Sequence, residues 1–79
     1  MKYNKVEALL KLKDMNISDF ARHLNVSRQQ ISNKKKNDTF RADELIQLAE
    51  LTNTNLSFTD KETGKIIMSF DINDVQKGT

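Results

Sequence analysis

The chain has 79 residues, with 13 Lys+Arg, 11 Asp+Glu, one His, and neither Cys nor Pro. A chain of this length forms one small domain that buries only about 60–65% of its unfolded surface, so its core is thin. The lack of Cys excludes a disulfide framework and a cysteine-based metal site. The apolar runs are far shorter than the roughly 20 residues of a membrane span, and no signal-peptide pattern is seen.

The net charge of +2 is distributed unevenly along the chain. Residues 1–53 hold ten basic and seven acidic side chains, whereas residues 54–79 hold three and four. Between Arg22 and Arg41, six basic side chains stand against a single acid, Asp38. Such a stretch can be the footprint of a polyanion. An isolated Lys run is more often a solvated surface, so the neighbouring residues decide between the two interpretations.

The first predicted element is a helix over residues 4–13. Asn4 can cap it, and Glu7 three residues later can return the bond to complete a capping box. An apolar stripe that begins at Val6 then follows helical spacing and faces the core.

Two short helices joined by a tight turn are predicted between residues 16 and 33. Asn16 caps the first helix, and Asn25 ends it because Asn tolerates the left-handed backbone conformation. Ser27 starts the second helix, with Gln30 three residues later in a second capping box. Two short helices with so brief a connection have the geometry of a helix-turn-helix.

A longer fourth helix is predicted after a polar stretch, with Leu45 and Leu48 on its buried face. Its start is poorly capped, because Arg41 stands where Ser or Thr would be better. Either Asn53 or Asn55 can end it.

The chain then changes to a period of two in the segments Leu56–Thr59 and Ile66–Phe70, which predicts a β-hairpin. The second strand places three apolar side chains on one face, namely Ile66, Met68 and Phe70. Ile67 points to the opposite face, so both faces are apolar. Because a lone hairpin is marginal in water, it must pack on the helices, on another copy, or on both.

The segment from Val6 to Phe58 resembles the DNA-binding domain of the phage-repressor and Cro superfamily, the XRE-type helix-turn-helix proteins. The residues that carry the resemblance are Phe20-Ala21-Arg22-His23-Leu24-Asn25-Val26-Ser27-Arg28-Gln29-Gln30-Ile31-Ser32-Asn33. The resemblance covers about two thirds of the chain. It implies a mainly α fold, a four-helix lambda-repressor-like helix-turn-helix domain over residues 1–55. A C-terminal β-hairpin over residues 56–72 and a frayed tail over residues 73–79 follow.

The resemblance places the second motif helix in the major groove, with its N-terminal residues at base edges. If Ser27 caps that helix and Ile31 points inward, the opposite face is free to read bases. Arg pairs with guanine edges, and Gln or Asn with adenine edges. In order of expectation, the base-reading residues are Arg28, Gln29, Asn33, Ser32 and Gln30. Gln30 ranks low because the capping box already gives it a structural role.

Phosphate contacts are expected on both sides of this helix. The candidates are Asn16, Ser27, Lys34, Lys35, Lys36 and Arg41. At Ile17 the chain departs from relatives, which often carry a polar phosphate contact there, so that contact must come from the backbone or be missing. The hairpin resembles, more weakly, a dimerising hairpin of some small phage repressors. This second resemblance predicts a dimer interface in the hairpin, formed by Phe58, Ile66, Ile67, Met68 and Phe70.

These features predict a sequence-specific transcriptional regulator, a phage- or mobile-element-type repressor that binds an inverted-repeat operator on double-stranded DNA as a homodimer. Two alternatives stay open: an antitoxin-like autorepressor, and a helix-turn-helix module used only for protein–protein interaction. Catalysis is not expected, because His23 has no nearby ligand set and no Gly-rich phosphate loop is present. No metal, cofactor, small-molecule ligand or membrane partner is expected. The resemblance implies a cytoplasmic location for a bacterial or phage-encoded protein.

Overall fold

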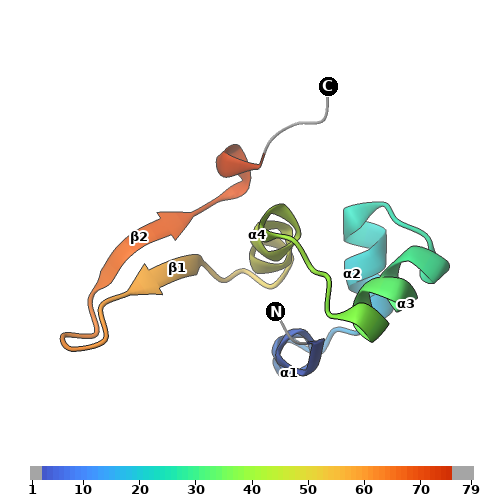
Figure 1. Cartoon of the computed structure of the whole chain (residues 1–79), viewed down its shortest axis with the longest axis horizontal. Coiled ribbons are helices and arrows are strands. Elements are labelled where there is room, and N and C mark those ends of the chain that lie inside the picture. The colour runs from blue at the N-terminus through green and yellow to red at the C-terminus, as the bar shows by residue number, and fades with distance from the viewer. Residues whose placement is uncertain (1–2, 76–79) are drawn as a thin grey trace.

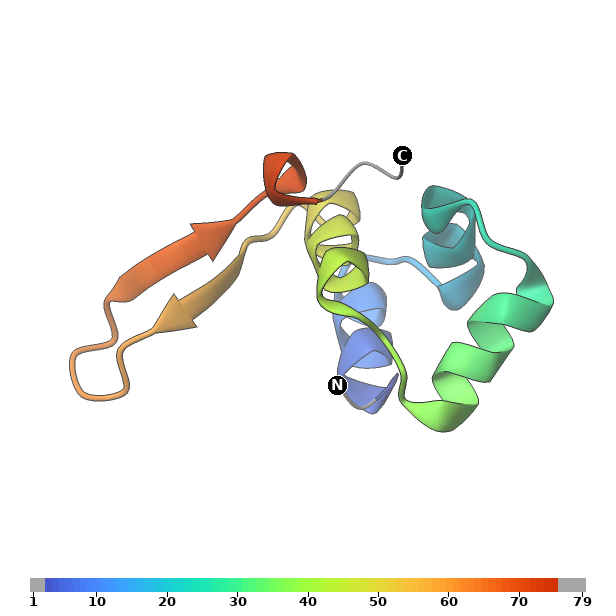
Figure 2. The same ribbon diagram turned by 45° about the horizontal axis from the view of Figure 1, so that its top comes forward.

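Four helices form the body of the protein in the computed structural model, which describes residues 3–75. They are α1 (Tyr3–Leu12), α2 (Ile17–Leu24), α3 (Arg28–Asn37) and α4 (Ala42–Leu51). An antiparallel hairpin of β1 (Leu56–Thr59) and β2 (Ile66–Phe70) follows and extends away from the helices (Figures 1 and 2). A short 3₁₀ helix, η1 (Ile72–Asp74), comes last. The predicted class, a four-helix helix-turn-helix domain followed by a hairpin, is confirmed.

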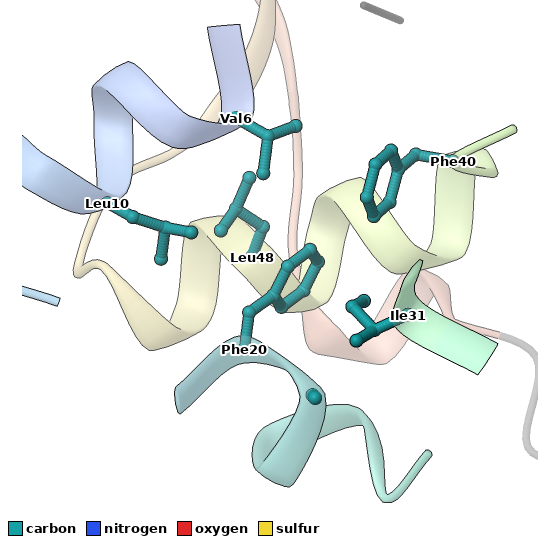
Figure 3. Close-up of a cluster of buried hydrophobic side chains, with 7 residues drawn as sticks. Val6, Leu10, Phe20, Ile31, Phe40 and Leu48 are labelled. Carbon is teal, nitrogen blue, oxygen red and sulfur yellow. The ribbon is translucent and has the colours of Figure 1, made fainter. Parts of the chain in front are cut away.

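The core lies where the four helices meet around Phe20, which is completely buried (Figure 3). Its ring stacks on Phe40, with 5.8 Å between the ring centroids. All four helices, and the α3–α4 connection, contribute to this cluster, which consists of Val6, Leu10, Phe20, Ala21, Ile31, Phe40 and Leu48. Full burial of a side chain such as Phe stabilises the fold by about 1.5–3 kcal/mol. The motif helices are therefore fixed by their inner faces, which leaves their outer faces free.

The start of α1 differs from the prediction. Asn4 lies inside the helix and not at its cap, since the described helix already includes Tyr3. The backbone N–H of Tyr3 donates instead to Oδ1 of Asp38, at 2.8 Å. Asp38 itself is the C-cap of α3, in the left-handed conformation with φ 52°. One residue therefore ends α3 and satisfies a free N–H at the start of α1, a contact between residues 35 positions apart.

The poor cap of α4 is compensated from inside the helix. Arg41 makes no side-chain cap bond, as expected, but its backbone N–H donates to Oε1 of Glu44 at 2.8 Å. At the other end α4 stops at Leu51, and Asn53 adopts the left-handed conformation with φ 55°. Of the two predicted terminators, Asn53 is therefore the one at the helix end.

The two strands have the predicted bounds, but their register contains an irregularity between Phe58 and Thr59. Phe58 pairs with Met68, whereas Thr59 pairs with Ile66, so Ile67 is the extra residue of a bulge. The prediction that Ile66 shares a face with Met68 and Phe70 is therefore wrong, because directly paired residues lie on the same face and Thr59 alternates away from Phe58.

The hairpin has one strongly apolar face, which we call the aromatic face. It carries two cross-strand pairs, Leu56 opposite Phe70 and Phe58 opposite Met68. The rings of Phe58 and Phe70 meet edge to face, with centroids 5.7 Å apart. Phe58 is nevertheless 64% exposed and Met68 54% exposed, whereas Leu56 and Phe70 are half-buried, so the helical body leaves the Phe58–Met68 part of this face uncovered.

The connection between the strands is organised by Asp60. Its Oδ1 accepts hydrogen bonds from the backbone N–H groups of Glu62 and Thr63, at 2.8 and 3.0 Å. These bonds, that of Thr63 first, lower the pKa of the Asp60 carboxyl. Gly64 follows with φ 75°, a conformation that suits glycine.

The end of the described chain is also more ordered than predicted. Asp71 caps η1: its Oδ1 accepts from the N–H of Asn73 at 2.8 Å, and its own N–H donates to Oδ2 of Asp74. The turn packs against α4. Residues 73–75 therefore do not belong to a frayed tail, and the rest of that prediction, residues 76–79, lies outside the described residues.

Candidate nucleic-acid interface

The α2–turn–α3 unit is held by hydrogen bonds that its own sequence supplies. The Asn16 side chain accepts from the N–H of Asp19 at 3.0 Å, and the Asp19 carboxylate accepts from the N–H of Asn16 at 2.9 Å. Asn25 ends α2 in the left-handed conformation, with φ 58° and ψ 45°. Ser27 and Gln30 repeat the reciprocal box at the start of α3, at 3.1 and 2.8 Å. The three predicted capping signals of the motif are confirmed.

The α3 helix buries one side chain, Ile31, and presents the rest of its surface to solvent or to neighbouring helices. With 3.6 residues per turn, Gln29 and Asn33 lie about 160° around the helix from Ile31. Both are exposed, and Nε2 of Gln29 donates to Oδ1 of Asn33 at 3.4 Å. Lys36 continues the same outer stripe one turn later. This stripe is the outermost surface of the motif.

The two flanks of α3 face different helices. Arg28, Ser32 and Lys35 lie on the flank toward α2, and together with α2 they line an open hollow of about 380 Å³. Gln30 and Lys34 lie on the other flank, toward α4. Among the predicted base readers, Arg28, Gln29, Ser32 and Asn33 are thus exposed on adjoining surfaces, whereas Gln30 is held in its capping box.

Lys34 differs from Lys35 and Lys36, the two neighbouring lysines that are also predicted to contact phosphates. Its Nζ lies 2.7 Å from Oε2 of Glu44, and the side chains of the two residues are only 22% and 10% exposed. The same carboxylate accepts from the N–H of Arg41 through its other oxygen. Glu44 thus fixes α3 against the start of α4, and the charge of Lys34 is neutralised inside the fold.

Lys35 is exposed but has a partner, since its Nζ lies 5.0 Å from the centre of the Tyr3 ring. Partial burial first, and the neighbouring Glu7 carboxylate second, raise the pKa of the Tyr3 hydroxyl. Lys11 first, then Tyr3 and Lys35, lower the pKa of the Glu7 carboxyl, so it is ionised at neutral pH. A small charged cluster therefore joins α1 to the end of α3.

The remaining phosphate candidates are spread around the motif. Asn16 and Ser27 are exposed at the starts of α2 and α3, although their side chains are used in the capping boxes. Arg41 is exposed and forms a two-point pair with Asp43, at 3.3 and 3.2 Å. Within residues 3–75, Lys36 makes no ion pair. The predicted Lys run is thus divided among an internal ion pair, an aromatic contact and a free cation.

Three residues that are not among the predicted DNA contacts also contribute to this surface. Arg22, which belongs to the basic stretch, lines the hollow between α2 and α3 and pairs with Asp19 at 3.1 Å. The sequence pattern does not indicate the role of Glu44, because its ion pair with Lys34 depends on the tertiary approach of α3 to α4. Ile17 is half-buried against the core and lines the same hollow.

Over residues 3–75, no group of three His, Cys, Asp or Glu side chains could hold a metal ion. No helix in that range is long and apolar enough to cross a membrane.

Comparison with known proteins identifies one family. Residues 9–59 match the family model described as the bacteriophage CI repressor helix-turn-helix domain. The matched range begins within α1 and ends with β1, so it includes the whole α2–turn–α3 unit and stops before β2. Comparison with curated proteins and with solved structures gives no match.

The contrast between Lys34 and Lys36 gives a stability prediction. Lys34→Met removes the partner of a largely buried carboxylate and should lower the free energy of unfolding by about 1–3 kcal/mol. Lys36→Met makes the same chemical change at an exposed position and should alter it by less than about 0.5 kcal/mol. Urea unfolding followed by circular dichroism measures both values. Equal, small effects would show that the Lys34–Glu44 pair does not hold α3 against α4.

Proposed function

Because the chain belongs to the bacteriophage CI repressor helix-turn-helix family, a family of DNA-binding repressors, we propose that it reads an inverted-repeat operator as a homodimer. In this proposal α3 enters the major groove, and the two copies of α3 lie one helical turn of DNA apart, about 34 Å. Repression follows from occupation of the operator, which keeps polymerase from the promoter.

The observation that carries the proposal is the way α3 is presented. Its inner face is fixed by Ile31, its start by the Ser27–Gln30 box, and its flank by the Lys34–Glu44 pair. The outer stripe keeps polar side chains that have no structural task beyond a long bond between Gln29 and Asn33. A rigid helix with a free polar face suits base readout, because its side chains reach base edges without reordering the backbone.

Each proposed base-reading residue suits a particular base through its hydrogen-bond donors and acceptors. Arg28, at the first position of α3, suits the O6 and N7 atoms of guanine, which accept both donors of a guanidinium. Gln29 and Asn33 suit adenine, whose edge offers one acceptor and one donor to an amide. Ser32 can donate to either purine or accept from a base amine. Gln30 is assigned to the capping box and to no base.

Phosphate contacts are proposed for the exposed cations and the helix starts. Among residues 3–75 Lys36 has no ion-pair partner, while Lys35 and Arg41 can turn from Tyr3 and Asp43 toward a phosphate. Asn16 and Ser27 mark two helix N-termini, where backbone N–H groups and the helix dipole favour an anion. Lys34 is assigned to positioning α3 through Glu44, because its charge is already matched.

A second copy of the chain is the proposed occupant of the aromatic face of the hairpin. Phe58 and Met68 form a directly paired, exposed apolar patch beside Phe70. Ile66 and Ile67, which are 62% and 65% exposed, extend the apolar surface around the bulge. Apolar surface of this kind on a small domain favours association. The hairpin is attached to α4, which packs on α2, so a two-fold contact here would fix the relative orientation of the two motifs.

The DNA-binding part of the proposal predicts a steep salt dependence. If a dimer contacts about six to eight phosphates, a plot of log affinity against log salt should have a slope near −5 to −7. Arg28→Ala should relax selectivity at one base position by tenfold or more, whereas Lys36→Ala should weaken all sequences alike and reduce the slope by about 1 per subunit. Mobility-shift titrations over several salt concentrations measure these effects. Binding that is absent or insensitive to salt would instead favour a protein-interaction module.

The dimer part predicts a difference between two adjacent residues of β2. Met68→Lys puts a charge on the aromatic face and should give a monomer at micromolar concentration in sedimentation velocity. Ser69→Lys introduces the same side chain on the other face and should leave the dimer intact. A wild-type monomer that occupies single half-sites, or a Ser69→Lys variant as dissociated as Met68→Lys, would contradict the assignment of the aromatic face.

A further inference from the structure

The hollow between α2 and α3 has an apolar floor to which the proposed base and phosphate contacts assign no role. It opens beside the proposed base readers, since Arg28 and Ser32 form part of its wall. Its floor is apolar and combines the two motif helices with their turn: Ile17, Ala21, Val26 and Ile31. Ala21 and Ile31 are buried, while Ile17 and Val26 are half-exposed and available to an incoming group.

The charges around this floor restrict what can occupy it. Three cationic side chains line the hollow, those of Arg22, Arg28 and Lys35, and none of the acidic residues within 3–75 lines it. A phosphate alone would be attracted to these cations but would gain nothing from an apolar floor. The complementary occupant is therefore an apolar group carried next to negative charge.

DNA presents such a group in the major groove. Thymine carries a C5-methyl group at the same edge where Arg28 would meet a guanine, and each nucleotide supplies a phosphate nearby. Cytosine, adenine and guanine have no methyl group at that edge. An apolar side chain at the start of α2 would thus discriminate thymine from the other bases.

We infer that Ile17 is a specificity-determining residue that receives the C5-methyl group of an operator thymine, with Val26 beside it and Arg28 next to it in the groove. This inference rests on the proposed function. It also gives a reason for an apolar residue at a position facing DNA, where a phosphate-binding side chain would be polar. With Ile17 at this position, a phosphate contact that would be the same for every DNA sequence is replaced by a methyl contact that depends on the base.

The test uses the full chain and an operator obtained by selection from random DNA. Each thymine of the half-site is replaced in turn by deoxyuridine, which removes only the methyl group. We expect one thymine in each half-site at which this replacement weakens binding about fourfold, the equivalent of removing one methyl group from an apolar contact. Replacement at the other thymines should have no effect of that size.

The same measurement with Ile17→Ala connects the methyl group to the residue. The variant should bind thymine and uracil operators equally well at the sensitive position. Leu12→Ala is the matched control, because Leu12 is an exposed aliphatic side chain on α1 that does not line the hollow; it should retain the fourfold ratio. A ratio between two operators does not depend on the folded fraction, so destabilisation by Ile17→Ala does not disturb the comparison.

Two results would overturn the inference while leaving the proposed function intact. The first is specific binding in which no thymine responds to the loss of its methyl group. The second is an Ile17→Ala variant that keeps the full ratio between thymine and uracil. Absence of specific DNA binding by the wild-type chain would remove the proposed function and this inference together.

Discussion

The burial of Phe20 is the contact on which the rest of the structure depends. Helices of eight to ten residues are too short to be stable alone in water, so the motif exists only because its inner faces are packed. Phe20 meets Phe40 from the α3–α4 connection and shares its cluster with residues of α1, α3 and α4. This single centre sets the angle between α2 and α3, and with it the surface offered to DNA.

The parts of the fold that could be predicted are those decided within a few residues. The boxes at Asn16 and Ser27 and the left-handed Asn25 each involve backbone groups at most four residues away, so residue types at fixed spacing are enough. Tertiary contacts were not accessible in this way. The bond from Tyr3 to Asp38 joins residues 35 positions apart, and it replaced a plausible local cap at Asn4.

The same division applies to the candidate site. Exposure of Arg28, Gln29, Ser32 and Asn33 follows from helical spacing once Ile31 is known to point inward. The different partners of the three consecutive lysines do not follow from helical spacing. Lys34 lies on the flank of α3 that meets Glu44, whereas Lys35 and Lys36 do not. The bulge at Ile67 also changed which residues share the aromatic face, since one extra residue reverses the alternation along a strand.

In the proposed complex, two copies of α3 occupy successive major grooves on one side of the operator. Hydroxyl-radical footprinting of the selected operator tests it most directly. We expect two protected regions related by two-fold symmetry, with centres separated by one turn of the duplex, about 34 Å. A single protected region at saturating protein, or two regions on opposite sides of the duplex, would contradict it.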